Sequence, residues 1–377
     1  MKKGWEVKKL GDVCEVIAGQ SPESKFYNTI GEGLPFYQGK KEFADKFIGS
    51  PKTWTTKITK EAIANDVLMS VRAPVGPVNF ANQKICIGRG LAAIRAGNLI
   101  DKEFLFYFLI KHENEIIGNS GAVFNSINKT QIKNIQIPLP PLPEQKRIVA
   151  ILDKAFTAIE RAKANTEENL QNAKEIFESY LQSVFENRGE DWEEKKLGEV
   201  CSIVAGQSPK SIFYNSIGEG LPFYQGKKEF TDKFVGEPKI WTTKITKEAI
   251  QNDILMSVRA PVGPINFATQ KICIGRGLAA IRAYKSIDKE FVFSFLLHHK
   301  NSIVGNAGAV FNSINKTQIC AIQIPVPTLK EQHQLVKTIN KIQDNTQKLQ
   351  SIYEQKLIDL EELKKSLLQK AFNGELI

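Results

Sequence analysis

Hydrophobic residues in the first 143 positions form short runs that turn residues interrupt. Val67–Val71 is followed by Ala73-Pro74, and Ile85–Ile87 is followed by Gly88. Short apolar runs that end at proline or glycine are typical of β-strands. Residues 1–143 are therefore expected to contain several short strands.

One stretch of this region, Asp101–Ile110, has the spacing of a helix. Asp101 is a suitable N-cap residue, because its carboxylate accepts hydrogen bonds from the first free amides of a helix. Four apolar residues after it share one helical face and are predicted to belong to the core: Phe104, Leu105, Phe108 and Leu109. Strands and helix together predict a compact α+β domain.

A much longer helical pattern starts where this domain ends. The proline run in residues 137–145 excludes a helix interior, and a new element is expected to begin there. From Glu144 to about Phe185, apolar residues recur at steps of three and four: Ile148, Ile151, Leu152, Ala155, Ile159, Ala162, Ala173, Ile176, Phe177, Tyr180, Leu181 and Val184. The pattern predicts an amphipathic helix roughly 60 Å long.

The last part of the chain repeats this pattern. Thr328 and Glu331 have the spacing of a capping box, which begins a helix. The apolar positions that follow are Leu335, Val336, Ile339, Ile342, Leu349, Ile352, Leu360, Leu363 and Leu367. Because one domain does not cover so long a stripe, the two helices are expected to pack against each other as an antiparallel coiled coil.

The chain consists largely of one sequence written twice, with an offset of 187 residues. Residues 5–145 align without a gap with residues 192–332, and 109 of the 141 positions are identical. Solenoid repeats are shorter and occur at least three times, so two similar globular domains are the better interpretation. Antiparallel packing of equivalent helices then predicts pseudo-twofold symmetry between them.

The predicted fold class is α+β, with two similar globular domains separated by two long antiparallel helices that form a coiled coil. The predicted domain boundaries follow the order of the chain. They are 1–143 for the first globular domain, 144–190 for the first helix, 191–330 for the second globular domain and 331–377 for the second helix.

The excess positive charge lies entirely in the two globular domains. The chain carries a formal net charge of +10, and residues 1–143 hold 19 basic and 13 acidic side chains. Residues 191–330 hold 18 and 12, whereas the helical segments 144–190 and 331–377 hold 7 and 9, and 7 and 7. Two equal basic blocks separated by segments without positive excess favour binding to a polyanion over an evenly solvated surface.

Residues that usually perform catalysis or bind metals are sparse. The only histidines are His112, His298, His299 and His333, and the adjacent pair is expected on a helix surface. No pair of cysteines has CxxC spacing, and all five are expected to be reduced thiols: Cys14, Cys86, Cys201, Cys273 and Cys320. Gly39-Lys40 and Gly226-Lys227 lack the other residues of a phosphate-binding loop. The sequence predicts no catalytic residue, no metal site and no cofactor.

No segment indicates a membrane. A membrane span needs roughly 18 apolar residues, and no stretch approaches that length. The opening residues 1–9 carry lysines, but no apolar run follows them. A cytoplasmic location is expected.

Basic, amide and hydroxyl side chains near glycines and strand ends are the candidates for DNA contact, because these groups bond to phosphates and base edges. In the first copy they are Gln38, Lys40, Lys41, Thr55, Thr56, Lys57, Ser70, Arg72 and Arg89. In the second copy they are Gln225, Lys227, Lys228, Thr242, Thr243, Lys244, Ser257, Arg259 and Arg276.

Neighbouring residues are expected to support these contacts. Trp54 would provide an aromatic wall beside Lys57, and Gly88 and Gly90 would let the guanidinium of Arg89 approach a duplex closely. Two alternatives remain open for a further group, which either contacts DNA or caps and solvates the next helix: Asn125, Lys129, Asn312 and Lys316.

Several segments carry a resemblance to a known family. They are the opening residues 5–11, RAPVG at 72–76, RGLAAI at 89–94, the proline junction at 137–145 and the closing residues 370–376. Together with the two-copy layout, these segments resemble the specificity subunits of type I restriction-modification enzymes. The resemblance extends over essentially the whole chain.

The resemblance implies two target-recognition domains, each binding one half of an interrupted site in double-stranded DNA. It also implies that the helices dock two methyltransferase subunits, and that restriction and translocase subunits join this core. S-adenosylmethionine, ATP and magnesium would belong to those partners. The chain departs from the family's common pattern because its two domains are nearly identical. Identical domains related by a twofold axis predict a palindromic interrupted site with half-site centres about 10 base pairs apart.

Two other functions fit the same residues. One is a stand-alone DNA-binding regulator that uses the twofold arrangement as a repressor dimer does. The other is a coiled-coil scaffold whose basic domains bind protein or RNA. Selective binding to a duplex would argue against the scaffold, and neighbouring methyltransferase genes would favour the specificity subunit over both.

Overall fold

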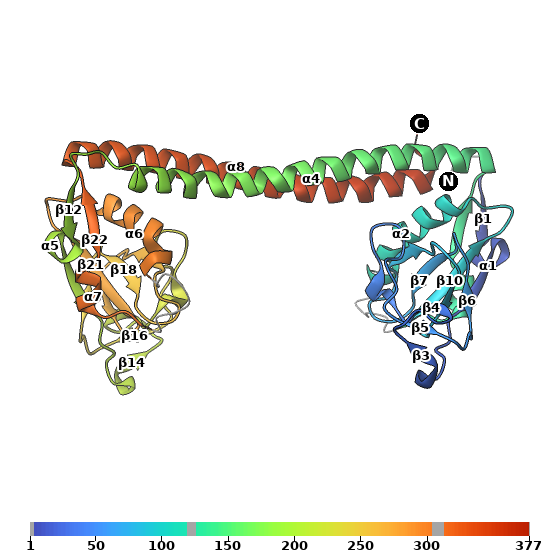
Figure 1. Ribbon diagram of the computed structural model, residues 1–377, viewed down its shortest axis with the longest axis horizontal. Coiled ribbons are helices and arrows are strands. Elements are labelled where there is room, and N and C mark those ends of the chain that lie inside the picture. The colour runs from blue at the N-terminus through green and yellow to red at the C-terminus, as the bar shows by residue number, and fades with distance from the viewer. Residues whose placement is uncertain (1–3, 119–125, 304–312, 377) are drawn as a thin grey trace. The chain divides into compact units, whose positions relative to one another are not determined.

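The computed structural model describes residues 4–118, 126–303 and 313–376. The candidate contact residues Asn125 and Asn312 lie outside these ranges. Figure 1 labels the helices and strands of the described part.

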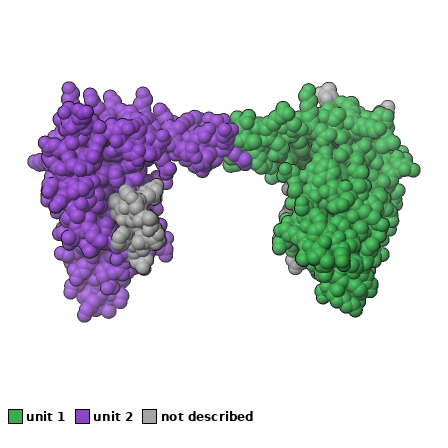
Figure 2. Space-filling view, viewed as in Figure 1, with its two compact units in different colours: residues 1–166, 355–377 green, residues 167–354 purple. Residues whose placement is uncertain are grey.

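The chain forms two compact units, coloured separately in Figure 2. Unit 1 consists of residues 1–166 and 355–377, and unit 2 consists of residues 167–354. The domain boundaries predicted from the sequence follow chain order, whereas each compact unit combines one globular domain with parts of both long helices.

The globular part of unit 1 contains three helices of four residues or more and eleven strands among its described residues. The strands are β1 Glu6–Lys9, β2 Cys14–Ala18, β3 Tyr27–Asn28, β4 Leu34–Tyr37, β5 Trp54–Thr55, β6 Glu61–Ala62, β7 Val67–Ser70, β8 Val78–Phe80, β9 Ile85–Ile87, β10 Leu91–Ala96 and β11 Gln136–Leu139. The helices are α1 Leu10–Val13, α2 Lys102–Gly118 and α3 Lys129–Lys133.

Unit 2 repeats these elements in the same order. Its strands are β12 Glu193–Lys196, β13 Cys201–Ala205, β14 Tyr214–Asn215, β15 Leu221–Tyr224, β16 Trp241–Thr242, β17 Glu248–Ala249, β18 Ile254–Ser257, β19 Ile265–Phe267, β20 Ile272–Ile274, β21 Leu278–Ala283 and β22 Gln323–Val326. Its helices are α5 Leu197–Val200, α6 Lys289–Ile303 and α7 Lys316–Cys320, and the long helices are α4 Leu142–Glu186 and α8 Leu329–Asn373.

Two sheets pack face to face in each globular part. In unit 1 an antiparallel sheet has the order β2-β10-β7-β8, and a mixed sheet has the order β3-β5-β4-β9-β6. Alternate residues of β10 enter two different cores: Ala92 and Ile94 face the helices, while Leu91 and Ala93 face the mixed sheet. A strand that is buried on both faces has a nearly continuous apolar sequence, which explains why this stretch shows no polar alternation.

Helix α2 lies between the antiparallel sheet and the long helices (Figure 1). Phe106 stacks on Phe80 of the sheet, while Phe104 packs against Phe372 of α8. The four core residues predicted for this helix are buried, and Phe106 and Tyr107 are buried as well. Because α2 is covered on two sides, it is apolar over most of its surface instead of along one stripe.

A buried glutamine fixes each long helix to its globular domain. The Gln145 side chain of α4 is fully buried, accepts a hydrogen bond from the Asp101 amide at 2.7 Å, and donates to the carbonyls of Leu99 and Pro140. Asp101 in turn caps α2, as predicted, by accepting from the amides of residues 103 and 104. The equivalent Gln332 of α8 bonds to the Asp288 amide in unit 2.

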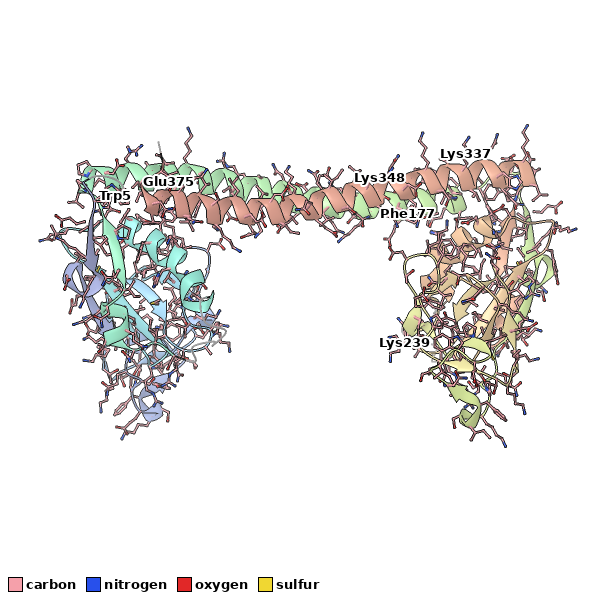
Figure 3. The ribbon with its side chains drawn as sticks, turned by 180° about the vertical axis from the view of Figure 1, so that it is seen from behind. Trp5, Phe177, Lys239, Lys337, Lys348 and Glu375 are labelled. Carbon is pink, nitrogen blue, oxygen red and sulfur yellow. The ribbon has the colours of Figure 1, made fainter. Side chains whose placement is uncertain are left out.

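The long helices pair within each unit. In unit 1, Lys163 and Glu160 of α4 form ion pairs with Glu361 and Lys364 of α8, at 3.0 and 3.1 Å. Residue numbers rise on one helix as they fall on the other, so the pairing is antiparallel. In unit 2, apolar residues of α4 and α8 share one core, and Figure 3 labels Phe177 on α4 among them. The predicted α+β fold with a helical coiled coil is confirmed, and the twofold relation between the domains stays a prediction.

The capping box predicted at the start of α8 is present, because the Thr328 amide donates to Glu331 and the Glu331 amide donates to the Thr328 hydroxyl. Four of the five cysteines are buried, and burial raises the pKa of Cys14 and of Cys201 to about 12. Such thiols are poor nucleophiles. No described helix is both long and apolar enough to cross a membrane.

Phe372→Ala is predicted to destabilise unit 1 by about 3–5 kcal/mol, because it removes a buried ring that packs on Phe104 and Phe108. Hydrogen exchange followed by mass spectrometry should show faster exchange in α2 with little change in α6. Phe185→Ala, at the equivalent position of unit 2, should show the reverse. Ile358→Ala is the control, since this side chain on α8 is 53 % exposed. Equal effects of both phenylalanine variants on both units would contradict the division.

Candidate nucleic-acid interface

Backbone hydrogen bonds bring three of the predicted clusters together. The Gly90 amide donates to the Gln38 carbonyl at 3.0 Å, and the Gly90 carbonyl accepts from the Val71 amide at 2.9 Å. Arg89 precedes Gly90 and Arg72 follows Val71, so both arginines and Gln38 lie within one short stretch of surface. Unit 2 has the same bonds from Gly277 to Gln225 and from Val258 to Gly277.

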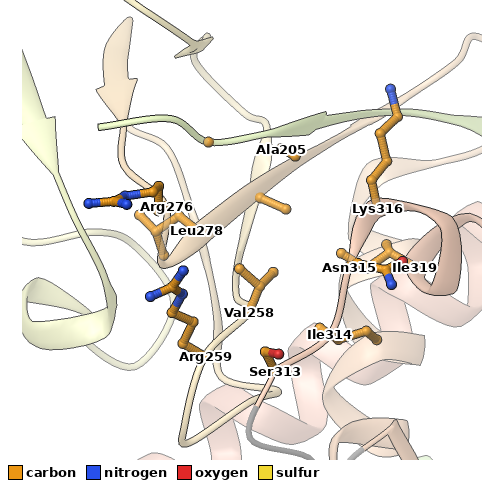
Figure 4. Close-up of a pocket in the computed structure, with 12 residues that line it drawn as sticks. Ala205, Val258, Arg259, Arg276, Leu278, Ser313, Ile314, Asn315, Lys316 and Ile319 are labelled. Carbon is orange, nitrogen blue, oxygen red and sulfur yellow. The ribbon is translucent and has the colours of Figure 1, made fainter. Parts of the chain in front are cut away.

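The segment before α3 joins this surface. The Ile127 amide donates to the Val71 carbonyl at 3.0 Å, and Ile314 does the same to Val258 in unit 2. In unit 2 this packing forms an open pocket of about 430 Å³ whose lining includes Arg259, Arg276 and Lys316. Figure 4 shows the two arginines and Lys316 on opposite sides of the pocket. Three cationic side chains from three separate segments therefore line one pocket.

The helix that follows each group of candidates is capped by a residue outside that group. Asn128 and Asn315 cap α3 and α7, and each forms a capping box with a glutamine three residues later. Lys129 and Lys316 lie in the first turn of these helices and are exposed. The lysines remain free for contact with a ligand, whereas the capping asparagines serve the helix.

Most candidate side chains are accessible to a ligand. In unit 1 Lys40 is half-buried, and the exposed candidates are Gln38, Lys41, Thr56, Lys57, Arg72 and Arg89. In unit 2 all the corresponding residues are exposed: Gln225, Lys227, Lys228, Thr243, Lys244, Arg259 and Arg276. That these side chains contact DNA stays a prediction.

Four predicted hydroxyls are not accessible. Thr55 is fully buried and its hydroxyl donates to the Lys57 carbonyl, while Ser70 is buried and donates to the carbonyls of Arg72 and Pro74. Their copies, Thr242 and Ser257, make the same bonds. These hydroxyls shape the loops that carry Lys57 and Arg72, so they are removed from the candidate contacts. Sequence spacing did not distinguish a turn-forming hydroxyl from an exposed one.

The neighbouring residues also act differently from what was expected. Lys57 lies over the ring of Phe26, with its Nζ 5.0 Å from the ring centroid, and Lys244 lies over Phe213 at 5.2 Å. The aromatic partner is thus a phenylalanine thirty-one positions earlier, and no contact with Trp54 is seen among the described residues. Only the pairing of β3 with β5 brings these positions together.

Gly88 and Gly90 are needed for internal packing. A Cβ atom at Gly90 would lie 2.3 Å from the Gln38 carbonyl oxygen, and one at Gly88 would lie 2.9 Å from the Gln38 Cα. The glycines let the strand ends meet. They therefore place Arg89 beside Gln38, which differs from the predicted role of clearing space for a duplex.

Two further arginines are structural. Arg95 makes two hydrogen bonds of 2.9 Å to the buried carboxylate of Asp66, and Arg282 binds Asp253 in the same way. Hydrogen bonds to the aspartate raise the pKa of each guanidinium. A bidentate pair of this kind holds a planar guanidinium in place. Because both arginines pair with buried aspartates, they are not available to phosphate.

No cluster of three or more potential metal ligands occurs in the described part of the chain. His298 and His299 are half-buried beside Phe185, and burial lowers the pKa of both imidazoles. Their expected position on an open helix surface is therefore corrected: they pack between α6 and α4.

Comparison with known proteins identifies the family. The model of the type I restriction modification DNA specificity domain matches residues 2–169 and again residues 189–357. The chain belongs to the type I restriction-modification specificity family. The resemblance noted in the sequence is thereby confirmed.

Relatives of the specificity family match the chain over nearly its full length. A putative type I restriction enzyme MjaX specificity subunit of Methanocaldococcus jannaschii is 34 % identical, over 99 % of this chain and 93 % of that protein. The EcoBI specificity subunit of Escherichia coli is 21 % identical over 99 % of this chain and 86 % of its own length.

Solved structures show the same architecture. A chain from a study of complex assembly and conformational transition of the type I R-M system has a TM-score of 0.87 and 30 % identity, covering 100 % of this chain and 99 % of that one. The HsdS subunit from Thermoanaerobacter tengcongensis has a TM-score of 0.72 and 29 % identity, covering 100 % and 98 %.

Membership of the specificity family settles the class of function. Specificity subunits are the non-catalytic DNA-recognition subunits of type I systems, so the predicted class of function is confirmed. The alternative of a stand-alone regulator receives no support from these comparisons.

The double variant Arg89→Ala and Arg276→Ala is predicted to weaken duplex binding by about 1–3 kcal/mol for each contact that is lost. Fluorescence anisotropy on selected and on mixed-sequence duplexes distinguishes the two kinds of contact. Loss on all sequences indicates phosphate contacts, whereas relaxed selectivity indicates base contacts.

The matched control for this pair is Lys337→Ala with Lys348→Ala, which also removes two positive charges. Both lysines are exposed on α8 and are labelled in Figure 3. If the control weakens binding as much as the arginine pair does, the effect comes from net charge and the arginines do not belong to the interface.

Proposed function

We propose that each unit binds one half of an interrupted DNA site through the surface around its two exposed arginines. The observation that carries this proposal is the recurrence of the same exposed donors on the same backbone framework in both units. Arg72 and Arg89 correspond to Arg259 and Arg276, with equivalent bonds through Gly90 and Gly277. Exposed guanidinium and amide groups on adjoining loops suit phosphates and the base edges of guanine and adenine.

The identity of the donors predicts identical half-sites. Differences between the copies avoid the exposed donors and fall at positions such as Gly97-Asn98-Leu99, which correspond to Tyr284-Lys285-Ser286. Two units with the same contact residues should therefore select the same short sequence.

The long helices are proposed to dock methyltransferase subunits, with restriction and translocase subunits completing the complex. The pairing of α4 with α8 leaves large apolar side chains exposed on both helices, among them Ile176 at 49 %, Ile352 at 59 % and Ile358 at 53 %. Leu349, which is 37 % exposed, lies one helical turn from Ile352 on the same face of α8. Neighbouring exposed apolar side chains are typical of protein interfaces. Cofactors of the methylation and cleavage reactions would then be bound by the partners.

Selection of bound duplexes from a random pool is predicted to yield an interrupted palindrome, with half-site centres about 10 base pairs apart if both units contact one face of the duplex. The methylated bases in the host genome should give the same site. Recovery of a direct repeat would contradict the twofold relation between the units. Two unrelated half-sites would show that the few differing residues carry the specificity.

Leu349→Asp with Ile352→Asp, two positions on one face of α8 in unit 2, is predicted to abolish co-purification with the methyltransferase subunit, because an exposed apolar contact is replaced by a charge that the partner would have to desolvate. Circular dichroism and duplex binding by the isolated chain should stay unchanged. Point variants are preferable to deletion of the helices, since Phe156 and Phe372 belong to the core of unit 1. The charged control is Gln347→Asp, at an exposed polar position of α8. Retention of the methyltransferase by the double variant would exclude this face.

A further inference from the structure

The two units differ in charge beside the conserved donors. We define the phenylalanine corner of unit 1 as Phe26, Lys57 and the flanking residues Glu23 and Lys25. In unit 2 the corner consists of the equivalent residues Phe213, Lys244, Lys210 and Ile212. The aromatic ring and the lysine above it are retained, whereas both flanking residues change.

In unit 1 the carboxylate of Glu23 forms ion pairs with both lysines of the corner. One oxygen of Glu23 lies 2.7 Å from Nζ of Lys25, and the other lies 3.7 Å from Nζ of Lys57. All three side chains are at least half exposed. Exposed ion pairs of this kind add little to stability, so their main effect is on what else the lysines can bind.

In unit 2 the carboxylate is absent. Lys210 takes the place of Glu23 and Ile212 takes the place of Lys25, and Ile212 is 79 % exposed. Lys244 still lies over Phe213. No carboxylate of the described residues lies within ion-pair distance of Lys244 or Lys210. The charged groups of the corner add up to +2 in unit 2 and to +1 in unit 1.

The corner adjoins the proposed DNA surface. The Ser21 hydroxyl accepts a hydrogen bond from the Arg89 amide at 3.2 Å, and the chain reaches Glu23 two residues later. The Thr56 amide donates to the Phe26 carbonyl at 3.2 Å. Ser208 and Thr243 make the equivalent bonds in unit 2. A phosphate held near Arg89 or Arg276 therefore lies near the corner of the same unit.

We propose that the two units bind the DNA backbone unequally, and that unit 2 makes at least one phosphate contact more than unit 1. Glu23 competes with phosphate for Lys57, while Lys244 and Lys210 meet no such competitor. This inference rests on the proposed function. Both units share the residues that select bases, but the affinity of unit 2 for its half-site depends more strongly on salt concentration than that of unit 1.

The salt dependence of binding by the full chain tests the inference. Each phosphate contact contributes about 0.9 to the slope of log K against log salt concentration. On a short duplex of mixed sequence, Glu23→Lys should steepen this slope by about 1–3, because it adds one cation and releases Lys25 and Lys57. Glu23→Gln releases Lys25 and Lys57 without adding a cation and should steepen the slope by about 1–2. Lys210→Glu should flatten the slope by about 1–2.

Matched controls carry the same charge changes on the long helices. Glu168→Lys on α4 corresponds to Glu23→Lys, and Lys348→Glu on α8 corresponds to Lys210→Glu; both positions are exposed. The slopes of the two controls should equal that of the unaltered chain. Controls that shift the slope as far as the corner variants would overturn the inference, because net charge would then explain the effect.

The remaining outcomes separate this inference from the proposed function. An unaltered chain that binds no duplex even at low salt contradicts the proposed function itself. If the unaltered chain binds, but Glu23→Lys and Lys210→Glu leave its slope unchanged, the proposed function stands and the unequal corners do not contact the backbone.

Discussion

The architecture depends on one buried polar contact, repeated in each unit. Gln145 and Gln332 are completely buried in the first turns of the two long helices, and each accepts a hydrogen bond from the amide of a capping aspartate, Asp101 or Asp288. A buried amide that lost these partners would carry the full cost of its desolvation. Each contact therefore fixes the first turn of a long helix to the first turn of a buried helix of the globular domain: α4 to α2 in unit 1, and α8 to α6 in unit 2.

The consequence of this attachment is a shared core. Once α4 is held at Gln145, its residues Phe156 and Ile159 lie in the same core as Phe104 of α2 and Phe372 of α8. The globular domain and the helix pair stabilise each other in one hydrophobic cluster. The interface loops follow strands of both sheets, since Arg72 comes after β7 of the antiparallel sheet and Arg89 comes after β9 of the mixed sheet.

The elements were easier to predict than the site. Long periodic stripes, capping residues and proline junctions are local signals, which is why α4, α8 and the cap at Asp101 were recognisable from the sequence. The two compact units could not be recognised in this way, because contacts such as that of Phe104 with Phe372 join residues that are far apart in the sequence. In the site, Arg89 lies between two glycines and Arg95 lies in an apolar strand, but the partner that holds Arg95, the buried Asp66, is distant in the sequence and is known only from the fold. Thr55 and Ser70 were misjudged for the same reason, since burial is a property of the fold.

The composition of the units has a bearing on the order in which they form during synthesis. All residues of unit 2, from 167 to 354, have been translated before the segment 355–377 that completes unit 1. Domains commonly fold as they emerge from the ribosome. The core of unit 1 is therefore the last to be complete in translation, when Phe372 joins Phe104 and Phe108 of α2.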